Sequence, residues 1–247
     1  TDFHAVVVTQ GWFWSGSSQG LCGWDGNRWH YLAGPRWLPS DDVRALLPIE
    51  NAIYVGTGNG FAEIRLDPTT LERKAADFDA RIQDRHLRLK GYVTSSRLDV
   101  PGDLSTSRPV PSDNDGLWTA LYLAAHSYRF AVTEEPQARH FADQAFDAIA
   151  WLEGVTTVDG FPTKAIISPD EDTGSDPVSW YPSTDGQWLW KGDCSSDEID
   201  GHMYGYSIYY DLAATDEKRA EIRDLVDRIM GHILDNGYLL IGADGKR

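Results

Sequence analysis

The sequence predicts an α+β multidomain protein in which antiparallel β hairpins come first and αα-hairpins follow. A repeat with a period of 40 residues, built of short apolar segments and glycine turns, fills the first third of the chain. Two similar helical hairpins, offset by 82 to 85 residues, fill the last half. The 247 residues include 41% hydrophobic and 12% aromatic side chains, which is too rich in core formers for a disordered acidic chain.

Residues 1–70 are predicted to form two propeller-like β repeats. Segments 12–21 and 52–61 align at the offset of 40, and each contains a strand, a glycine-rich turn that favours positive φ and a second strand. Residues 23–29 predict a tight hairpin between aromatic strands. Short strands with a period near 40 are typical of the blades of a β-propeller. Two unrelated hairpins are the alternative.

Residues 71–111 are predicted to be a connector between the β repeats and the helices. Segment 74–88 fits either a strand or a helix. Segment 97–111 is rich in serine and proline, which predicts an extended path.

Residues 112–247 predict a domain of αα-hairpins. Apolar residues follow helical spacing over 117–132, and a second helix begins near Thr133 and Pro136, the expected N-cap and first turn. The pattern recurs over 200–210 and 222–233, and Gly237 follows as a C-terminal cap. Such repeats favour a partial (α/α) toroid. Ordinary antiparallel helix pairs are the alternative.

The candidate catalytic residues lie in polar clusters at the starts of the two aligned hairpins, at 112–116 and 193–202. In a toroid both starts open at one end, so their carboxylates would surround one cavity. Glycoside hydrolysis needs a carboxylic acid and a carboxylate base, and we expect Glu198 as the acid with Asp115 or Asp197 as the base. Carboxylates at helix starts are also ordinary caps, so capping is the alternative for each of them.

Polysaccharide β-elimination is a second chemistry that these clusters could perform. His202 and Tyr206 are four residues apart and share a helix face, so they could supply the base. Asn114 and Arg97 could neutralise the carboxylate of a uronate. A histidine packed under the helix start is the alternative for His202.

Candidate substrate-binding residues precede the second cluster. Trp180, Trp188 and Trp190 lie in a loop rich in small and polar residues, and flat indoles stack on the apolar faces of pyranoses. Lys191 could contact an anion, and Asp113 would line the same cavity. Packing of the loop against the helices is the alternative for the tryptophans, and a solvated charge is the alternative for Lys191.

Charge and motifs exclude several function classes. The formal net charge is −16, which disfavours a nucleic acid or an anionic membrane as partner, and no apolar run reaches the ~20 residues that cross a bilayer. Nucleotide-binding, zinc-protease and serine-hydrolase motifs are absent from the sequence. We therefore expect a glycan partner, with no cofactor and no metal. Cys22 and Cys194 could pair or stay separate.

The segments "GSSQGLCGWDGNRW" and "VGTGNGFAEI" resemble the repeats of two-component-regulator type β-propellers, found in bacterial sensors and secreted enzymes. The segments "PSDNDGLWTALYLAAHSYRFAVT" and "WLWKGDCSSDEIDGHMYGYSIYYDLAATDEK" are similar to bacterial proteins that join such a propeller to an (α/α) toroid of the six-hairpin glycosidase kind. The resemblance covers residues 11–247 and implies a fold more than a reaction.

Three functions follow as expectations. The first is hydrolysis of an oligo- or polysaccharide, the second is a uronate lyase, and the third is a non-catalytic glycan-binding or sensor module. The chain starts at Thr1 and stops in a turn at 244–247, which suggests a fragment that lacks blades or hairpins, supplied by the rest of the chain or by another copy. A removed leader would fit a secreted or periplasmic protein.

Overall fold

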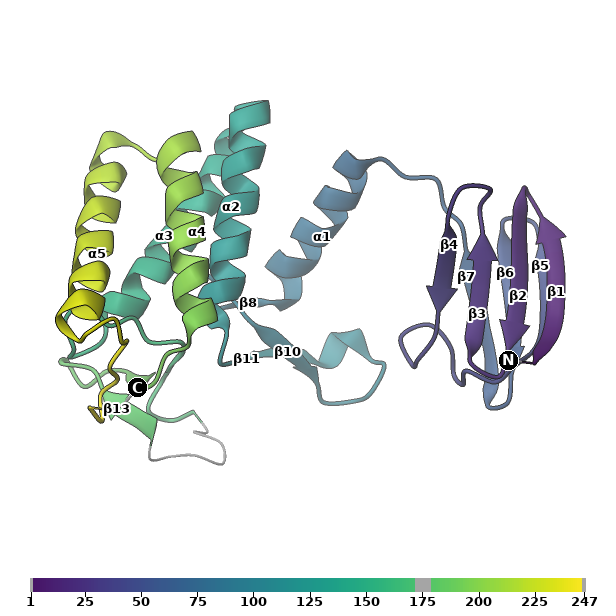
Figure 1. The fold of residues 1–247 in the computed structure, drawn as a ribbon, viewed down its shortest axis with the longest axis horizontal. Coiled ribbons are helices and arrows are strands. Elements are labelled where there is room, and N and C mark those ends of the chain that lie inside the picture. Colours follow the sequence, from purple (N-terminus) through teal and green to yellow (C-terminus); the bar gives the residue numbers. More distant parts are fainter. Residues whose placement is uncertain (1, 172–178, 246–247) are drawn as a thin grey trace. The chain divides into compact units, whose positions relative to one another are not determined.

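The computed structural model describes residues 2–171 and 179–245, which form two compact units, Thr1–Lys74 and Ala75–Arg247. Antiparallel β-sheets come first and helices that pack in pairs follow (Figure 1), so the mixed α+β prediction is confirmed. The described residues do not show a closed propeller or toroid. Thr1, Lys246 and Arg247, on which the fragment prediction partly depends, lie outside the described residues.

The first unit contains two antiparallel sheets whose strands follow chain order. The first sheet consists of β1 (Phe3–Thr9), β2 (Trp12–Ser17), β3 (Gly20–Trp24) and β4 (Trp29–Leu32). The second consists of β5 (Val43–Ile49), β6 (Ala52–Thr57) and β7 (Gly60–Arg65).

The 40-residue repeat is present in the backbone itself. The turn after β1 has Gln10 at a φ of 49°, and the turn after β5 has Glu50 at 50°. Gly20 and Gly60 open β3 and β7 with φ values of 128° and 126°, a region that L side chains rarely adopt. A register shift near the start of β1 recurs near the start of β5. The two sheets are therefore copies of one structural unit.

One apolar core joins the two sheets. Trp14 and Leu21 of the first sheet pack with Ile53 and Val55 of the second, and all four are buried. A Cβ on Gly16 would collide with the side chain of Val43, so this glycine permits close approach of the sheets.

The second unit begins within α1 (Leu71–Arg85), and the predicted connector forms part of it. After α1 come β8 (Leu87–Arg88), β9 (Tyr92–Val93), β10 (Ser95–Leu98), a 3₁₀ turn (Leu104–Thr106) and β11 (Ser107–Val110). Asp79 of α1 accepts a hydrogen bond from the Tyr122 hydroxyl at 2.7 Å. Tyr92 is buried and donates to the carbonyl of Ala148 at 2.6 Å. These two contacts tie α1 and β9 to the helices of the second unit.

Four long helices make up most of the regular structure of the second unit. They are α2 (Asp115–Thr133), α3 (Pro136–Gly154), α4 (Ser196–Leu212) and α5 (Asp216–Asp235). The four predicted helices are present, and α4 begins earlier than expected, at Ser196 rather than near Asp200. The prediction of Thr133 as an N-cap is wrong: Thr133 ends α2, and Glu135 precedes Pro136 at the N-cap of α3.

Helices α2 and α4 run side by side with their N-terminal ends together. Added Cβ atoms on Gly201 and Gly205 would meet Leu117 at 2.9 Å and Ala120 at 3.1 Å, so glycines on α4 allow close contact. Leu123, Phe146 and Tyr209 lie in the main helical core. Below the helices, β12 (Ile166–Ile167), β14 (Leu189–Lys191) and β13 (Trp180–Pro182) form a small antiparallel sheet in that order.

Candidate functional site

The helix-start cluster brings Glu198 of α4 against the first turn of α2. The Oε2 atom of Glu198 accepts the backbone N–H of Leu117 at 3.0 Å, so the carboxyl group caps the neighbouring helix. Its Oε1 atom is buried and has no hydrogen-bond partner among the described residues. Burial raises the pKa of Glu198 to about 8. The hydrogen bond from Leu117 opposes this increase, and the nearby carboxyl group of Asp115 adds to it. Glu198 therefore holds its proton at neutral pH.

Asp115 lies beside Glu198 at the start of α2. Its Oδ1 atom accepts the hydroxyls of Thr94 at 2.5 Å and Ser112 at 2.8 Å. Its Oδ2 atom has no partner within the part of the chain that the structure describes. Burial raises the pKa of Asp115 to about 6, although the hydrogen bonds from Thr94 and Ser112 lower it.

His202 and Tyr206 extend this cluster along α4. The His202 Nδ1 atom lies 3.4 Å from the Tyr206 hydroxyl. Nε2 is buried and has no partner in the described segments. Burial lowers the pKa of His202 to about 4 and raises that of Tyr206, so both rings are neutral near pH 7. The structure thus brings four of the five candidate catalytic residues together.

Within the part of the chain that the structure describes, this cluster is closed to solvent. Glu198 and His202 expose 0% of their surface, and Asp115 and Tyr206 expose 1% each. The fifth candidate, Asp197, is exposed, and the side chain of Ser195 lowers its pKa by hydrogen bonding. A glycan therefore reaches none of these four buried groups in this conformation.

Two lysines outside the clusters form ion pairs with the outer carboxylates of both clusters. The Lys191 ammonium lies 2.5 Å from Asp113, and the Lys164 ammonium lies 2.6 Å from Asp193 and 3.7 Å from Asp113. Burial opposes ionisation of Asp113, but Lys191 and Lys164 outweigh it and lower the pKa of this carboxyl group. Lys191 and Asp113 are therefore occupied by an ion pair with each other.

Two further candidate binding residues lie at different places. Asn114 occupies the N-cap position of α2, where its carbonyl accepts the N–H of Trp118 at 3.0 Å. Arg97 is exposed on β10, opposite Arg108 of β11.

The three candidate tryptophans have different surroundings. Trp190 is fully buried, stacks on Tyr181 with ring centroids 5.3 Å apart and donates Nε1–H to the carbonyl of Pro182. Trp180 lies half-buried in β13. Trp188 is half-buried and meets Trp151 edge to face at 5.0 Å. Trp188 alone of the three lines the pocket described next.

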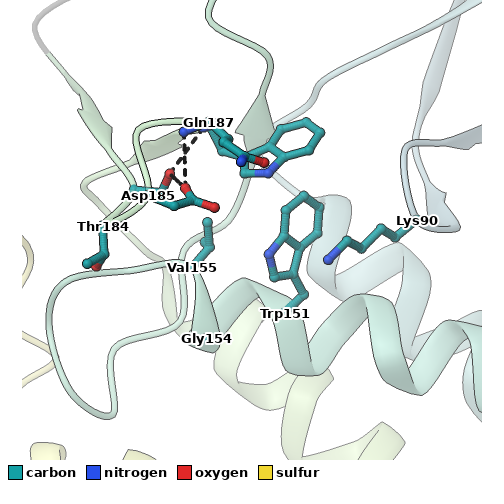
Figure 2. A pocket seen from close by; sticks show the side chains of 9 residues that line it. Lys90, Trp151, Gly154, Val155, Thr184, Asp185 and Gln187 are labelled. Carbon is teal, nitrogen blue, oxygen red and sulfur yellow. Dashed lines mark hydrogen bonds between the residues drawn. The ribbon is translucent and has the colours of Figure 1, made fainter.

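This pocket, called the tryptophan pocket below, has a volume of about 500 Å³ (Figure 2). Its lining combines two indoles with short polar side chains and one cation: Lys90, Trp151, Gly154, Val155, Ser183, Thr184, Asp185, Gln187 and Trp188. Figure 2 shows the Trp151 ring between Lys90 on one side and Val155 and Asp185 on the other. The Lys90 ammonium lies 3.9 Å from the Trp151 ring centroid, a cation–π contact.

A tight turn holds the polar side of the tryptophan pocket. The carboxylate of Asp185 accepts the Ser183 hydroxyl at 2.6 Å and the Gln187 N–H at 3.0 Å. The first of these hydrogen bonds is the main cause of the lowered pKa of Asp185, so this carboxylate is ionised at neutral pH. The pocket therefore offers two aromatic rings, an anion and a cation within one concave site.

Sequence reasoning found Trp188 but missed Trp151 and Lys90. Trp151 lies near the end of α3, and the apolar pattern of the sequence does not distinguish it from the other apolar residues of this helix. Lys90 lies in the predicted connector at 71–111, outside the polar clusters in which binding residues are expected. One feature of the sequence could have identified Trp151. It follows Ile149 by only two positions, so in a helix its side chain points away from the buried face that Ile149 occupies.

Comparisons with known proteins give no relative: no protein-family model matches the chain, and neither a curated protein nor a solved structure matches it. Within residues 2–171 and 179–245, no helix is long and apolar enough to span a membrane. In the same ranges, no group of three or more histidine, cysteine or carboxylate side chains is arranged to hold a metal ion.

Proposed function

We propose that this protein binds an oligo- or polysaccharide in the tryptophan pocket. The observation that supports the proposal is the pair formed by Trp151 and Trp188 within a concave site. Indoles stack on the apolar faces of pyranose rings, and a few polar groups around them fix orientation through hydroxyl hydrogen bonds. Asp185 and Gln187 are placed to supply such groups.

Isothermal titration calorimetry against a panel of oligosaccharides tests this proposal. Trp188→Ala is expected to weaken binding by about two- to tenfold, because an aromatic contact contributes about 0.5–1.5 kcal/mol and 1.4 kcal/mol is one factor of ten. Trp118→Ala is the matched control, since Trp118 is 42% exposed on α2 and does not line the pocket. Equal affinity of the Trp188 variant and the wild type would contradict the proposal, as would failure of every glycan to bind.

Hydrolysis is the second function that we propose, with Glu198 as acid and Asp115 as base. The observation that favours it is the raised pKa of about 8 at Glu198, since a general acid must hold its proton near neutral pH. Burial of both groups requires the starts of α2 and α4 to open for substrate. Release of new reducing ends that is lost in Glu198→Gln and Asp115→Asn supports hydrolysis. Products that absorb in the ultraviolet would instead indicate elimination through His202 and Tyr206.

We also propose the finer fold features. The matching sheets of the first unit support propeller blades, and the side-by-side first helices of two αα-hairpins support part of an (α/α) toroid. A secreted or periplasmic location stays a prediction.

A further inference from the structure

Each sheet of the first unit has two faces that repeat at the offset of 40 residues. Face A consists of Val7, Trp14 and Leu21 in the first sheet and of Leu47, Tyr54 and Phe61 in the second. Face B consists of Val6, Val8 and Phe13 in the first sheet and of Leu46, Pro48 and Ile53 in the second. The strand pairing places the members of each set on the same side, because directly paired residues point the same way.

The first sheet buries face A, and the second sheet exposes it. Trp14 and Leu21 are 1% and 0% exposed in the core between the sheets. Phe61, the counterpart of Leu21, is 76% exposed, and Leu47, the counterpart of Val7, is 56% exposed.

Face B shows the opposite arrangement. Ile53 of the second sheet is 2% exposed, in the same core as Trp14. On the first sheet Val8 is 71% exposed and Val6 is 58% exposed. The interface inside the unit is therefore heterologous: face A of one sheet meets face B of the next, and one uncovered face of each kind is left.

The two stacked sheets also point in the same direction. Near the start of β1, His4 Nδ1 lies 3.1 Å from the carbonyl of Val43, where β5 starts. After the end of β1, the Gln10 side chain donates to the carbonyl of Glu50, after the end of β5. Strands β1 and β5 thus lie alongside each other in parallel, so a third sheet could be added by the same step.

We propose that the exposed face A of one copy of this chain binds the exposed face B of a second copy, which repeats the interface between the two sheets. Continuity with that interface identifies the occupant, because each uncovered face is the repeat counterpart of one already buried. Trp29 and Tyr31 of β4 lie on the same side and are 62% and 60% exposed, so they extend the exposed apolar surface of face B. A heterologous contact continues until a ring closes or a filament forms.

Sedimentation velocity of the 247-residue chain over a wide concentration range tests the proposal. Association that increases with concentration is expected for the wild type. Val8→Asp removes face B and Phe61→Asp removes face A, so each variant alone is expected to stay monomeric. Val132→Asp is the matched control, since Val132 is 84% exposed on α2, and it should associate like the wild type.

Mixing the two variants identifies the type of interface. Val8→Asp keeps face A, and Phe61→Asp keeps face B, so their equimolar mixture is expected to form a 1:1 complex that neither variant forms with itself. A monomeric wild type at the highest concentration, association of either variant alone, or failure of the mixture to associate would each overturn the proposal. Circular dichroism of both variants verifies that they are folded.

Discussion

At the residue scale, the positions of two tryptophans in β14 and its flank decide which indole meets solvent. Trp190 lies in β14 and enters the core beside Tyr181, whereas Trp188 lies just before β14 and turns its ring toward Trp151. Their sequence surroundings are alike, so the sequence proposes both as binding residues. The difference arises because Trp190 lies in the central strand of the small sheet, whereas Trp188 lies outside that strand and contacts Trp151 of α3, and both are tertiary properties.

The raised pKa of Glu198 leads to a prediction about pH. A carboxyl group whose pKa is higher in the folded state binds its proton more tightly in the folded protein than in the unfolded chain. Its contribution to stability is fully present below the pKa of the unfolded chain. That contribution is lost as the pH rises to the folded-state pKa of about 8. We expect the free energy of unfolding to fall by roughly 2 kcal/mol between pH 6.5 and 8, since one pKa unit corresponds to about 1.4 kcal/mol. Urea unfolding at several pH values measures this loss.

Glu198→Gln is the control for this prediction, because an amide can accept the Leu117 N–H without titrating. The variant should show a flat stability profile from pH 6.5 to 8 and exceed the wild type at pH 8. Two neighbouring buried groups titrate lower: Asp115 has a pKa of about 6, and His202 has a pKa of about 4, so the contribution of His202 changes between pH 4 and 6.5. Parallel profiles for the two proteins would contradict the account.

At the scale of elements, the close contact of α2 and α4 depends on small residues at their N-terminal ends. A Cβ on Gly116 would collide with Glu198 Oε2 and lie 3.0 Å from His202 Nε2. We therefore expect Gly116→Ala to lower the free energy of unfolding by about 1 to 3 kcal/mol through overpacking, measured by urea denaturation.

Gly231→Ala is the matched control within a helix. A Cβ on Gly231 of α5 meets nothing within 4 Å, so alanine should stabilise the protein by about 1 kcal/mol through its better helix propensity. Stabilisation by both substitutions would show that the contact between α2 and α4 leaves room for a methyl group at position 116.

The elements themselves could largely be predicted from the sequence. Apolar spacing located α2, α3 and α5, because a helix that packs on one side must repeat its apolar residues at its own period. The repeat of Gly20 and Gly60 located two hairpins. The segment at 71–111 was harder, because α1 has no buried residue and its contact with α2 depends on polar groups such as Asp79. A pattern of apolar residues in the sequence does not reveal contacts between polar side chains.

At the scale of the whole molecule, the two units carry separate proposals. The first unit, Thr1–Lys74, has its own core and the two exposed faces that we propose for association. The second, Ala75–Arg247, contains both the buried helix-start cluster and the tryptophan pocket. The site could be predicted only in part, because Lys90, Trp151 and Trp188 are far apart in the sequence and meet through folding.

The central claim, that the tryptophan pocket binds a glycan, is tested most directly by NMR of the ten indole N–H groups during titration with the best-binding oligosaccharide. We predict that the Trp151 and Trp188 signals, assigned by single substitution, shift with a common saturation curve. Those of the buried Trp190 and of Trp14 in the first unit are expected to stay in place. Shifts confined to other indoles, with Trp151 and Trp188 unmoved at saturation, would contradict the account.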